Sequence, residues 1–582
     1  MRVAEATCYL ATLQMHNAPN INLAWTMLAV EECFRLGVRH AVICPGSRSA
    51  PLAIAFARHG KIQTHVAHDE RAGAFMALGV AKSSGLPAVL VMTSGTAVAN
   101  ALPSVVEARM SRTPLLVFSG DRPAELRDCG ANQAISQAAL LAGATRWCRD
   151  LPCPTDQIAA EYVLSTVDEA FARACGNAGA QAGAVHLNWQ FREPLAPEIA
   201  PWNLNWLKSI ARWTKDKSRA PWRTTRPAVE SSVALTDALV IAGRCNPITR
   251  ESLFKWRGTV LADVTSGLAT NATAGADLVL RAAHDGQGNA ALREALRVQT
   301  VVVVGDAVVS KRLNAWINQH DAVTLFGAGD PRVDPSHRAS SSYCAPVVFE
   351  AGARLRPHVG WKRALLCATR AASKAVQQER ALVEPTAIAD ATAACGELDH
   401  GTLFYGSSMP IRDADFLALH PPAGWQAGSN RGASGIDGLF ATAVGHALAS
   451  GQPVVAFVGD VSALHDLNSL QLASHVNTPL VLIVMNNDGG GIFRYLPVAK
   501  HADVFKTFFT TPHGREFTPI AKAFGLAHAS PSTRAAFSKC VSKALGRKGA
   551  TLIEVRCDAQ ASEAARARIA NASTAALAKE FR

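Results

Sequence analysis

The chain has 582 residues, of which 49% are hydrophobic, enough for roughly three or four domains with cores of their own. This composition excludes a disordered chain. We expect neither a membrane span nor a signal peptide, because no apolar run is long enough for a span and the first residues lack a signal's apolar segment. The thirteen cysteines include no C-x-x-C pair, which argues against a disulfide scaffold or zinc site and favours reduced thiols in the cytoplasm.

The first of three predicted regions runs to residue 205 and alternates strands with helices. Residues 1–20 are interpreted as a disordered extension, because the first convincing helix starts near Asn22. Short apolar runs that end in polar or glycine-rich turns predict buried strands at His40–Cys44, Ala88–Met92 and Leu115–Ser119. The region is therefore predicted to be an α/β domain.

Glu70 is the first candidate for chemistry. It follows an expected strand and begins the Ala-rich helical pattern of Ala72–Lys82. A carboxylate in the first turn is favourable in any helix, so this position alone favours a structural role over a catalytic one.

The most basic segment is Lys208–Arg226, with seven Lys or Arg residues against one acid, interleaved with Trp213 and Trp222. Together with the net charge of +12 and a pI near 9.2, this fits either nucleic-acid binding or a field that attracts small polyanionic substrates. Its prolines and its place between two α/β regions favour a solvated interdomain segment.

The rest of the chain is predicted to form two further α/β domains. A linker and central domain would span 206–365, and a third domain 366–582. The predicted strands are Ala238–Ala242, Thr259–Ala262, Thr300–Val304, Val323–Phe326, Val454–Val458, Leu480–Met485 and Thr551–Val555.

Two polar residues at the tips of predicted strands in the third region indicate a metal site. Asp460 follows the strand Val454–Val458, and Asn487 follows Leu480–Met485, with a leucine-bearing segment, 464–472, predicted as the crossover helix between them. A parallel unit of this kind brings both tips to the same carboxyl edge. Carboxylate, amide and backbone oxygens suit Mg²⁺ shared with phosphate oxygens. The pattern predicts a metal–diphosphate site.

A short internal echo accompanies these elements. Thr113–Val117 reads TPLLV and Thr478–Leu482 reads TPLVL, at equivalent places in the first and third regions. The echo alone is weak evidence for a duplicated domain. The predicted fold class is α/β, with three doubly wound parallel-sheet domains.

Longer motifs make a resemblance specific. The motifs are PGSRSAPL (45–52), HDERAG (68–73), TSGTAVAN (93–100), DRPAELRDCGANQAI (121–135), SKRL (310–313), SSMPIRD (407–413), SNRGASGIDG (429–438), GDVSALHDLN (459–468) and NNDGGGIFRYLP (486–497). Taken together and in order, they resemble the 2-succinyl-5-enolpyruvyl-6-hydroxy-3-cyclohexene-1-carboxylate (SEPHCHC) synthases, thiamine-diphosphate enzymes of menaquinone biosynthesis, over residues 22–560.

The resemblance implies a transferase that decarboxylates 2-oxoglutarate and adds the succinyl unit to isochorismate in a Stetter-like conjugate addition. It implies thiamine diphosphate and Mg²⁺, with Mn²⁺ as a substitute, and pyrimidine-binding, central and diphosphate-binding domains. The partners would be the two small substrates, with no nucleic acid. A homodimer would be the minimum active unit, in which Glu70 serves the partner's diphosphate site, and a homotetramer is expected as a dimer of dimers.

The resemblance also assigns residues to the cofactor. Glu70 would activate it through the aminopyrimidine N1′, Ile436 would support its bent form, and Asp460, Asn487 and the Gly489 carbonyl would hold the metal. Other residues expected near the cofactor are Thr96, Ser408, Met409 and Ile492.

Several cations are expected because the two substrates carry four carboxylates, and Arg prefers bidentate carboxylate contact. Arg412 and Arg431 would hold the distal carboxylate of the succinyl unit. These two arginines and Arg48 are expected to be catalytic. The residues expected around isochorismate are Ser47, Arg48, Arg122, Asn132, Gln133, Lys311 and Arg312, with Phe493 and Leu496, beside Ile492, as an apolar wall.

The chain departs from the commoner patterns at two places. Val461 follows Asp460 where a glycine is usual in the superfamily, which agrees with the menaquinone branch. Ser407 stands where an asparagine is often found, and we expect activity to survive it. His68 and His465 are interpreted as packed or solvated side chains rather than catalytic ones.

Two alternatives stay open. One is another thiamine-dependent 2-oxo acid carboligase or decarboxylase, such as an acetolactate synthase, which would have less need of Arg412 and Arg431. The other is a non-catalytic polyanion-binding protein that uses the basic surface and needs neither Mg²⁺ nor the cofactor.

Overall fold

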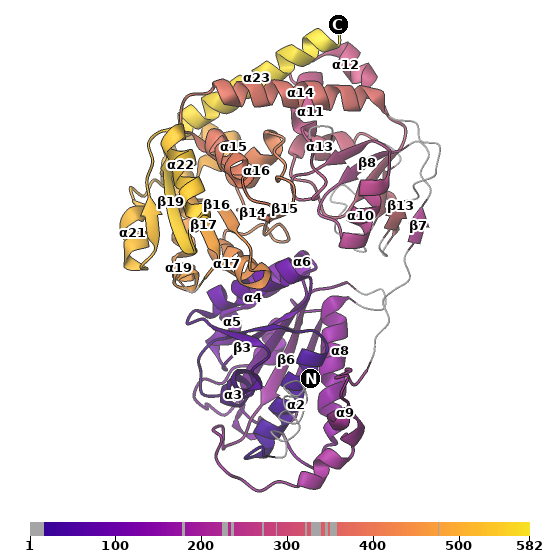
Figure 1. Cartoon of the computed structure of the whole chain (residues 1–582), viewed down its shortest axis with the longest axis vertical. Coiled ribbons are helices and arrows are strands. Elements are labelled where there is room, and N and C mark those ends of the chain that lie inside the picture. The colour runs from indigo at the N-terminus through magenta and orange to yellow at the C-terminus, as the bar shows by residue number, and fades with distance from the viewer. Residues whose placement is uncertain are drawn as a thin grey trace. The chain divides into compact units, whose positions relative to one another are not determined.

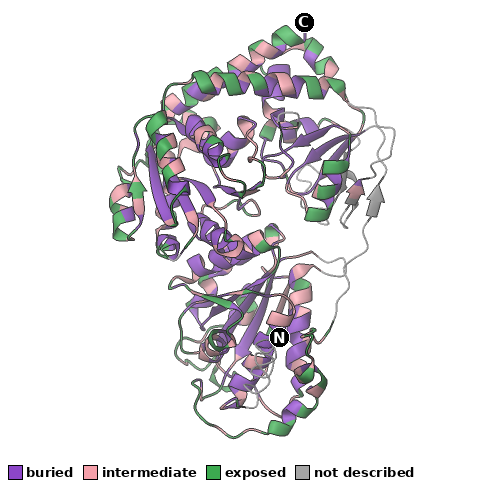
Figure 2. Cartoon of the chain, viewed as in Figure 1, coloured by how far each residue is buried: buried purple, intermediate pink, exposed green. Residues whose placement is uncertain are grey.

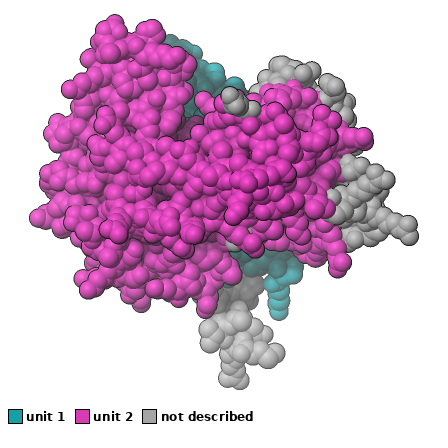
Figure 3. All heavy atoms as spheres, turned by 90° about the horizontal axis from the view of Figure 1, so that it is seen from above, with its two compact units in different colours: residues 1–227, 430–451, 466–472 teal, residues 228–429, 452–465, 473–582 magenta. Residues whose placement is uncertain are grey.

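The computed structural model describes residues 17–176, 181–223, 231–233, 238–270, 273–286, 288–320, 323–326, 339–343, 347–349, 358–474 and 476–582. The chain divides into two compact units (Figure 3). Unit 1 is 1–227, 430–451 and 466–472, and unit 2 is 228–429, 452–465 and 473–582. The prediction for the N-terminal extension lies outside the described residues as far as residue 16.

Unit 1 is built on a six-stranded, wholly parallel sheet in the order β2-β1-β3-β4-β6-β5. Figure 1 labels β3 and β6 of this sheet. Its inner strands are buried because helices cover both faces (Figure 2), as continuous apolar runs predict. The strands are β1 (His40–Ile43), β2 (Gln63–Val66), β3 (Ala88–Met92), β4 (Leu115–Asp121), β5 (Trp147–Leu151) and β6 (Ala184–Gln190).

Two sets of helices cover this sheet. On one face α2, α3 and α8 share a core with Trp25 and Phe118. On the other, α4 packs against β1 and β3 and against α17 from the distant segment 430–451. The helices are α2 (Ile21–Arg35), α3 (Ala50–His59), α4 (Glu70–Ser84), α5 (Thr96–Asn100), α6 (Leu102–Met110), η1 (Ala124–Leu126), α7 (Gln137–Ala142), α8 (Ala160–Cys175), η3 (Leu204–Lys208), α9 (Ala211–Lys215) and α17 (Leu439–Ser450).

The prediction that Lys208–Arg226 is a solvated segment holds for most cations of its described part, which ends at residue 223, such as the exposed Lys208, Lys215 and Lys217, but not for its tryptophans. Trp213 is buried, and its Nε1 donates to Glu32 of α2 at 2.6 Å. Arg219 forms an ion pair with Glu31 of the same helix, whose carboxylate is buried. The tryptophans that suggested base stacking instead anchor this segment to the core of unit 1.

Unit 2 contains a central parallel sheet in the order β12-β11-β10-β8-β9 and a parallel pair, β13 with β7. Their strands are β7 (Ser231–Val233), β8 (Leu239–Ala242), β9 (Val260–Ala262), β10 (Val301–Val304), β11 (Val323–Phe326), β12 (Ala339–Tyr343) and β13 (Val347–Phe349). The neighbouring helices are α10 (Pro247–Lys255), α11 (Ala276–His284), α12 (Ala290–Ala295), α13 (Lys311–Ile317) and α14 (Val359–Gln378).

Unit 2 also contains the third sheet, parallel throughout, in the order β15-β14-β16-β17-β19-β18. Helices α15, α16 and α22 pack on it around Tyr405 and Phe537. The strands are β14 (Gly401–Tyr405), β15 (Trp425–Gly428), β16 (Val454–Gly459), β17 (Pro479–Asn486), β18 (Ala527–Ala529) and β19 (Gly549–Arg556). The associated helices are α15 (Glu384–Cys395), α16 (Met409–Phe416), α18 (Asp460–His465), η5 (Leu467–Ser469), α19 (Leu470–Ala473), η6 (Gly491–Tyr495), η7 (Pro497–Lys500), α20 (Ala502–Phe505), η8 (Lys506–Thr510), α21 (Phe517–Ala523), α22 (Arg534–Leu545) and α23 (Ala559–Glu580).

The crossover between β16 and β17 is not the single helix that the leucine spacing predicts. It is divided into α18, η5 and α19, with a break at Asp466. The Asp466 carboxylate accepts the backbone N–H of Phe440, at the start of α17, at 2.8 Å, and the Ser469 hydroxyl at 2.7 Å. Asp466 therefore satisfies the N-terminus of another helix instead of continuing its own.

The predicted fold class is confirmed: the described residues form three parallel sheets of five or six strands with helices packed on them, besides the pair of β13 and β7. The sheet of unit 1 and the third sheet are both six-stranded and have the same strand order. The similar segments TPLLV and TPLVL lead into β4 and β17, which occupy the same place in that order. In the first of these sheets the connections turn in opposite directions between β1 and β3, and in the other between β14 and β16. The carboxyl ends of the strands at such a switch point are the expected place for a ligand. Within the described residues, no helix is both long and apolar enough to span a bilayer.

Candidate active site

Asp460 lies directly after β16, at the carboxyl edge of the third sheet, and is 2% exposed. Its Oδ2 accepts the backbone N–H groups of Asn487 (3.1 Å) and Gly489 (2.8 Å). Burial raises the pKa of Asp460, whereas the peptide N–H groups of Gly489 and Val461 and the nearby His513 oppose this rise. The structure thus brings the three residues expected at the metal together at one sheet edge.

The donors at this edge fit a hard divalent cation. The Oδ1 atom of Asn487 is buried and has no hydrogen-bond partner among the residues that the structure describes. Gly489 has φ of +137°, and a Cβ there would lie 1.9 Å from the Thr510 carbonyl oxygen, so only glycine allows this approach. One carboxylate, one amide oxygen and a nearby carbonyl suit Mg²⁺ better than zinc, and the described chain holds no His, Cys, Asp and Glu cluster of the zinc kind.

One neighbour of this edge, His513, was missed from the sequence. His513 Nε2 lies 3.2 Å from Asp460 Oδ2. Asp488 Oδ1 accepts the backbone N–H groups of His513 (2.9 Å) and Gly514 (2.7 Å), which fixes the loop that carries the histidine. No local sequence pattern around His513 predicts this contact, because the contact depends on how the loop after η8 folds back onto the sheet.

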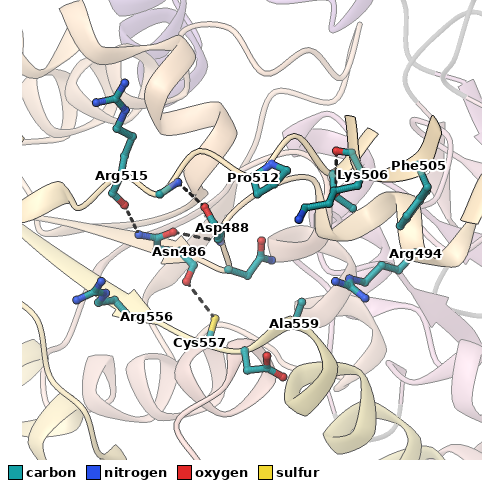
Figure 4. Close-up of a pocket in the computed structure, with 14 residues that line it drawn as sticks. Asn486, Asp488, Arg494, Phe505, Lys506, Pro512, Arg515, Arg556, Cys557 and Ala559 are labelled. Atoms are coloured by element: carbon teal, nitrogen blue, oxygen red, sulfur yellow. Dashed lines mark hydrogen bonds between the residues drawn. The ribbon is translucent and has the colours of Figure 1, made fainter. Parts of the chain in front are cut away.

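A pocket of about 780 Å³ opens between residues that include Asn486 and Asp488 (Figure 4), and Asn487 also lines it. On one side Asn486 Nδ2 donates to the Arg515 carbonyl at 2.9 Å. Cationic side chains outnumber carboxylates in its lining, which favours anionic groups. The charged lining residues are Asp488, Arg494, Lys506, Arg515, Arg556 and Asp558.

A network of charged side chains next to Asn487 was also missed from the sequence. Asn487 Nδ2 donates to Glu384 Oε1 at 2.6 Å, and the other Glu384 oxygen accepts from Arg566. Arg566 also forms a bidentate contact with Asp413, at 2.6 Å for each bond. Glu384 begins α15, and Arg566 comes from α23, so the network joins elements far apart in the chain.

The predicted cofactor contacts after β14 lie at the start of α16. Ser408 has φ of +74°, and Met409 is the first residue of the helix and is buried. Arg412 Nη1 donates to the Ser408 carbonyl at 2.5 Å, one turn back. Ser407, the departure from the commoner motif, is buried.

The predicted apolar wall belongs to η6 and the residue after it. Ile492, Phe493 and Leu496 are half-buried. The Phe493 ring lies 5.5 Å from the Phe509 ring, centroid to centroid, in an edge-to-face contact. This contact joins η6 to η8 on the loop that follows the metal edge.

In unit 1, Glu70 is the first residue of α4 and is half-buried. The preceding Asp69 caps the helix, so Glu70 is not needed as the cap; its Oε2 accepts from Asn100 at 3.3 Å. Thr96 is exposed at the first position of α5, after β3. Nearby, His68 is exposed and its Nδ1 lies 2.7 Å from Gln471 Nε2; in unit 2, His465 is exposed at the end of α18.

The cations of unit 1 lie at the carboxyl ends of β1 and β4. Arg122 Nη1 donates to Ser94 Oγ (2.7 Å) and to the Gln133 carbonyl (3.0 Å), and Gln133 Nε2 donates to the Ser94 carbonyl (2.9 Å). Arg48 Nη1 donates to the Phe191 carbonyl at 3.0 Å. Burial lowers the pKa of the Arg48 guanidinium; Glu193 opposes this, and Arg122 adds to it. Ser47 and Asn132 are exposed in the same loops.

The loop that carries Arg431 and Ile436 is fastened within unit 1 by Glu107 of α6. The two Glu107 oxygens accept the N–H groups of Gly432 (3.0 Å) and Ala433 (2.6 Å), and Lys82 donates to the same carboxylate at 2.9 Å. Both side chains of the ion pair are at most 5% exposed. Glu107 therefore fixes the backbone next to Arg431.

Lys311 and Arg312 begin α13 in the central sheet's part of unit 2. Lys311 is exposed. Arg312 forms ion pairs with Asp285 (2.8 Å) and Asp277 (3.5 Å), so its charge is already partly compensated. Within unit 2 the structure brings together the sheet edge with Asp460 and Asn487, α16 and η6, and within unit 1 the edge loops after β1, β3 and β4.

Three family models match the chain in succession. They are described as the N-terminal TPP binding domain of thiamine pyrophosphate enzymes (residues 26–140), the middle domain of thiamine pyrophosphate (203–404) and the C-terminal TPP binding domain of thiamine pyrophosphate enzymes (409–555). The chain is therefore a thiamine-diphosphate enzyme.

Curated relatives narrow this further. A 2-succinyl-5-enolpyruvyl-6-hydroxy-3-cyclohexene-1-carboxylate synthase of Aeromonas salmonicida is 38% identical over 564 residues, which is 92% of this chain and 95% of that protein. The chain belongs to the SEPHCHC synthase family. Synthases of Rubrobacter xylanophilus (38% over 566 residues) and Salinibacter ruber (37% over 575) each align with 93% of this chain and with 96% and 95% of their own lengths.

Proposed function

We propose that the protein condenses 2-oxoglutarate with isochorismate, with loss of CO₂, to form SEPHCHC in menaquinone biosynthesis. The proposal rests on the family and on one observation: an oxygen-rich metal edge in unit 2, with an arginine on the adjoining helix α16. Thiamine diphosphate supplies the electron sink for the decarboxylation when it is bound. The residues of this chain bind, orient and shield the reactants.

Asp460, Asn487 and the Gly489 carbonyl would hold Mg²⁺, or Mn²⁺ in its place. The unpartnered, buried Oδ1 of Asn487 supports this, because a buried polar oxygen without a partner is costly unless a ligand meets it. A cation would also offset the burial of the Asp460 carboxylate. The Ser408–Met409 turn, Thr96, Ile436 and Ile492 would contact the cofactor.

Glu70 would hold a proton at N1′ of the aminopyrimidine. Its place supports this role, since it is half-buried at the carboxyl edge of the first sheet and its helix is capped by Asp69 instead. A carboxylate freed from capping can exchange a hydrogen bond with a ligand at little cost to the helix.

The arginines would bind the four substrate carboxylates. Arg412 and Arg431 would hold the distal carboxylate of 2-oxoglutarate. Arg48, Arg122, Lys311 and Arg312, with Ser47, Asn132 and Gln133, would serve isochorismate beside Phe493 and Leu496. Guanidinium groups held by backbone carbonyls, as Arg48 and Arg412 are, lose little entropy on binding an anion.

We further propose three domains at 1–205, 206–365 and 366–582, with the first and third binding the pyrimidine and diphosphate ends of the cofactor. A homodimer would be the minimum active unit and a homotetramer the expected assembly. A cytoplasmic location is in keeping with the described cysteines, which are free thiols.

The decisive experiment follows isochorismate absorbance with purified protein, 2-oxoglutarate, Mg²⁺ and thiamine diphosphate, omitting each component in turn. Loss of absorbance only in the complete mixture is the expected result. Decarboxylation of 2-oxoglutarate or pyruvate that ignores isochorismate would instead indicate another carboligase. No cofactor-dependent turnover would overturn the proposal.

A further inference from the structure

The amide of Asn487 poses an orientation problem. A rotation of about 180° about its last torsion exchanges the oxygen with the NH₂ group at almost no change in shape. Only the oxygen can bind a hard cation, because the NH₂ group is a donor without an available lone pair. An asparagine that serves as a metal ligand therefore needs a partner that distinguishes its two ends.

Glu384 is such a partner. Its Oε1 accepts from Asn487 Nδ2 at 2.6 Å, and a carboxylate only accepts hydrogen bonds, so it selects the NH₂ end of the amide. Glu384 is 4% exposed, so water does not compete freely for this bond. The opposite end, Oδ1, is the buried atom without a partner in the described structure.

Arg566 keeps Glu384 in place. It donates to the second oxygen of Glu384 and, at 2.6 Å, to each oxygen of Asp413, which is 1% exposed. Its Nη1 also donates to Tyr495 Oη at 3.0 Å, at the end of η6. With its second oxygen tied to the Arg566 guanidinium, which is 11% exposed, the Glu384 carboxylate cannot turn away from Asn487.

We propose that Glu384 is a positioning residue, which fixes the Asn487 amide with Oδ1 presented to the metal, and that Arg566 fixes Glu384. The inference rests on the proposed metal site and extends it to two residues that do not touch the metal. Partners that orient metal ligands in this way typically change metal affinity by about 10- to 100-fold when they are replaced.

Glu384→Gln tests the inference. Glutamine has nearly the same shape but offers both a donor and an acceptor, so it accepts either orientation of the amide. We expect Mn²⁺ to bind about tenfold or more weakly, measured by the electron paramagnetic resonance of free Mn²⁺ at saturating thiamine diphosphate. The matched control is Asp390→Asn, an acid-to-amide change on the same helix whose partner is Arg534, and it should leave Mn²⁺ affinity unchanged.

A reciprocal exchange separates orientation from stability. Asn487→Asp alone places two carboxylates against each other and should weaken Mn²⁺ binding. In the double variant Glu384→Gln with Asn487→Asp, the glutamine NH₂ donates to the new carboxylate, which presents an oxygen to the metal in either orientation. We expect Mn²⁺ affinity to recover in the double variant, whereas a merely structural role for Glu384 predicts that the losses add.

The outcomes separate the two proposals. Wild-type protein that binds no Mn²⁺ with the cofactor would overturn the metal site and this inference with it. Wild-type binding with unchanged affinity in Glu384→Gln overturns the inference alone. Circular dichroism reports folding, and if Glu384→Gln does not fold, the test proceeds from Asn487→Asp: failure of the added Glu384→Gln to restore Mn²⁺ binding overturns the inference.

Discussion

The carboxylate of Asp460 accepts the backbone N–H of Gly489 at 2.8 Å, across 29 residues of chain. This bond joins the end of β16 to the glycine loop after β17. Because Gly489 has φ of +137° and lies against the Thr510 backbone, the bond also holds the loop in a conformation that other residues rarely adopt.

Gly489→Ala is the first prediction. The added methyl group would meet the Thr510 carbonyl, and the backbone conformation alone would cost about 1–3 kcal/mol. We expect Mn²⁺ binding to be lost, with a lower unfolding midpoint in urea. Gly143→Ala is the control, since that glycine follows α7 in unit 1 and its new Cβ would meet nothing within 4 Å. Equal metal affinity in Gly489→Ala and wild type would contradict the described loop geometry.

The second prediction concerns Glu107, which holds the loop of Arg431. Glu107→Ala leaves the buried Lys82 without its carboxylate, and breaking a buried pair costs about 3–5 kcal/mol. We expect a loss of that size in the free energy of unfolding, measured in urea. Glu169→Ala, which removes an exposed i,i+4 pair with Arg173, should change stability little. A similarly small effect in both variants would show that the contacts of Glu107 contribute nothing to the free energy of unfolding.

The third prediction is a pH dependence of stability. Burial, together with the neighbouring Glu32 carboxylate, raises the pKa of Asp168 to about 9, from 3.8 in the unfolded chain. The folded state therefore holds a proton that the unfolded state releases, so the stabilisation is complete below about pH 4 and is lost as the pH rises towards 9.

Asp168→Asn removes this titration. Over pH 5–9 the wild type should lose stability relative to the variant, by at most about 1.4 kcal/mol per pH unit. Thermal melts at stepped pH values measure the difference. Glu169→Gln, exposed on the same helix, should run parallel to the wild type. If the stability of Asp168→Asn also changes with pH in parallel with the wild type, the proton of the folded state is bound at another residue.

The fourth prediction tests the substrate assignment. Arg412→Ala should lower kcat/KM for 2-oxoglutarate by about 10- to 100-fold, the loss expected for a charge-assisted contact, while thiamine diphosphate still binds. Arg568→Ala, an exposed arginine paired with Glu379, is the matched control. Unchanged turnover in Arg412→Ala would remove this residue from the substrate site.

Much of the fold was predictable from local pattern. Continuous apolar runs identified β3, β4, β16 and β17, because inner strands of a parallel sheet are buried on both faces. Edge strands such as β5 and β18 carry exposed residues and gave no such run. The crossover after β16 was predicted as one helix from its leucines, and the break at Asp466 depends on α17, a partner outside that segment.

The sequence by itself determined the parallel sheets and the polar residues at the ends of their strands, because these follow from short-range patterns and fixed strand geometry. The cofactor class came from the resemblance of its longer motifs to a known family. Only the tertiary structure decided which residues support those polar residues. Glu384, His513 and Arg566 meet the sheet edge of Asp460 and Asn487 from α15, the loop after η8 and α23, and Glu107 meets the Arg431 loop from α6. Contacts between segments far apart in the chain have no local period, so folding alone brings these residues together.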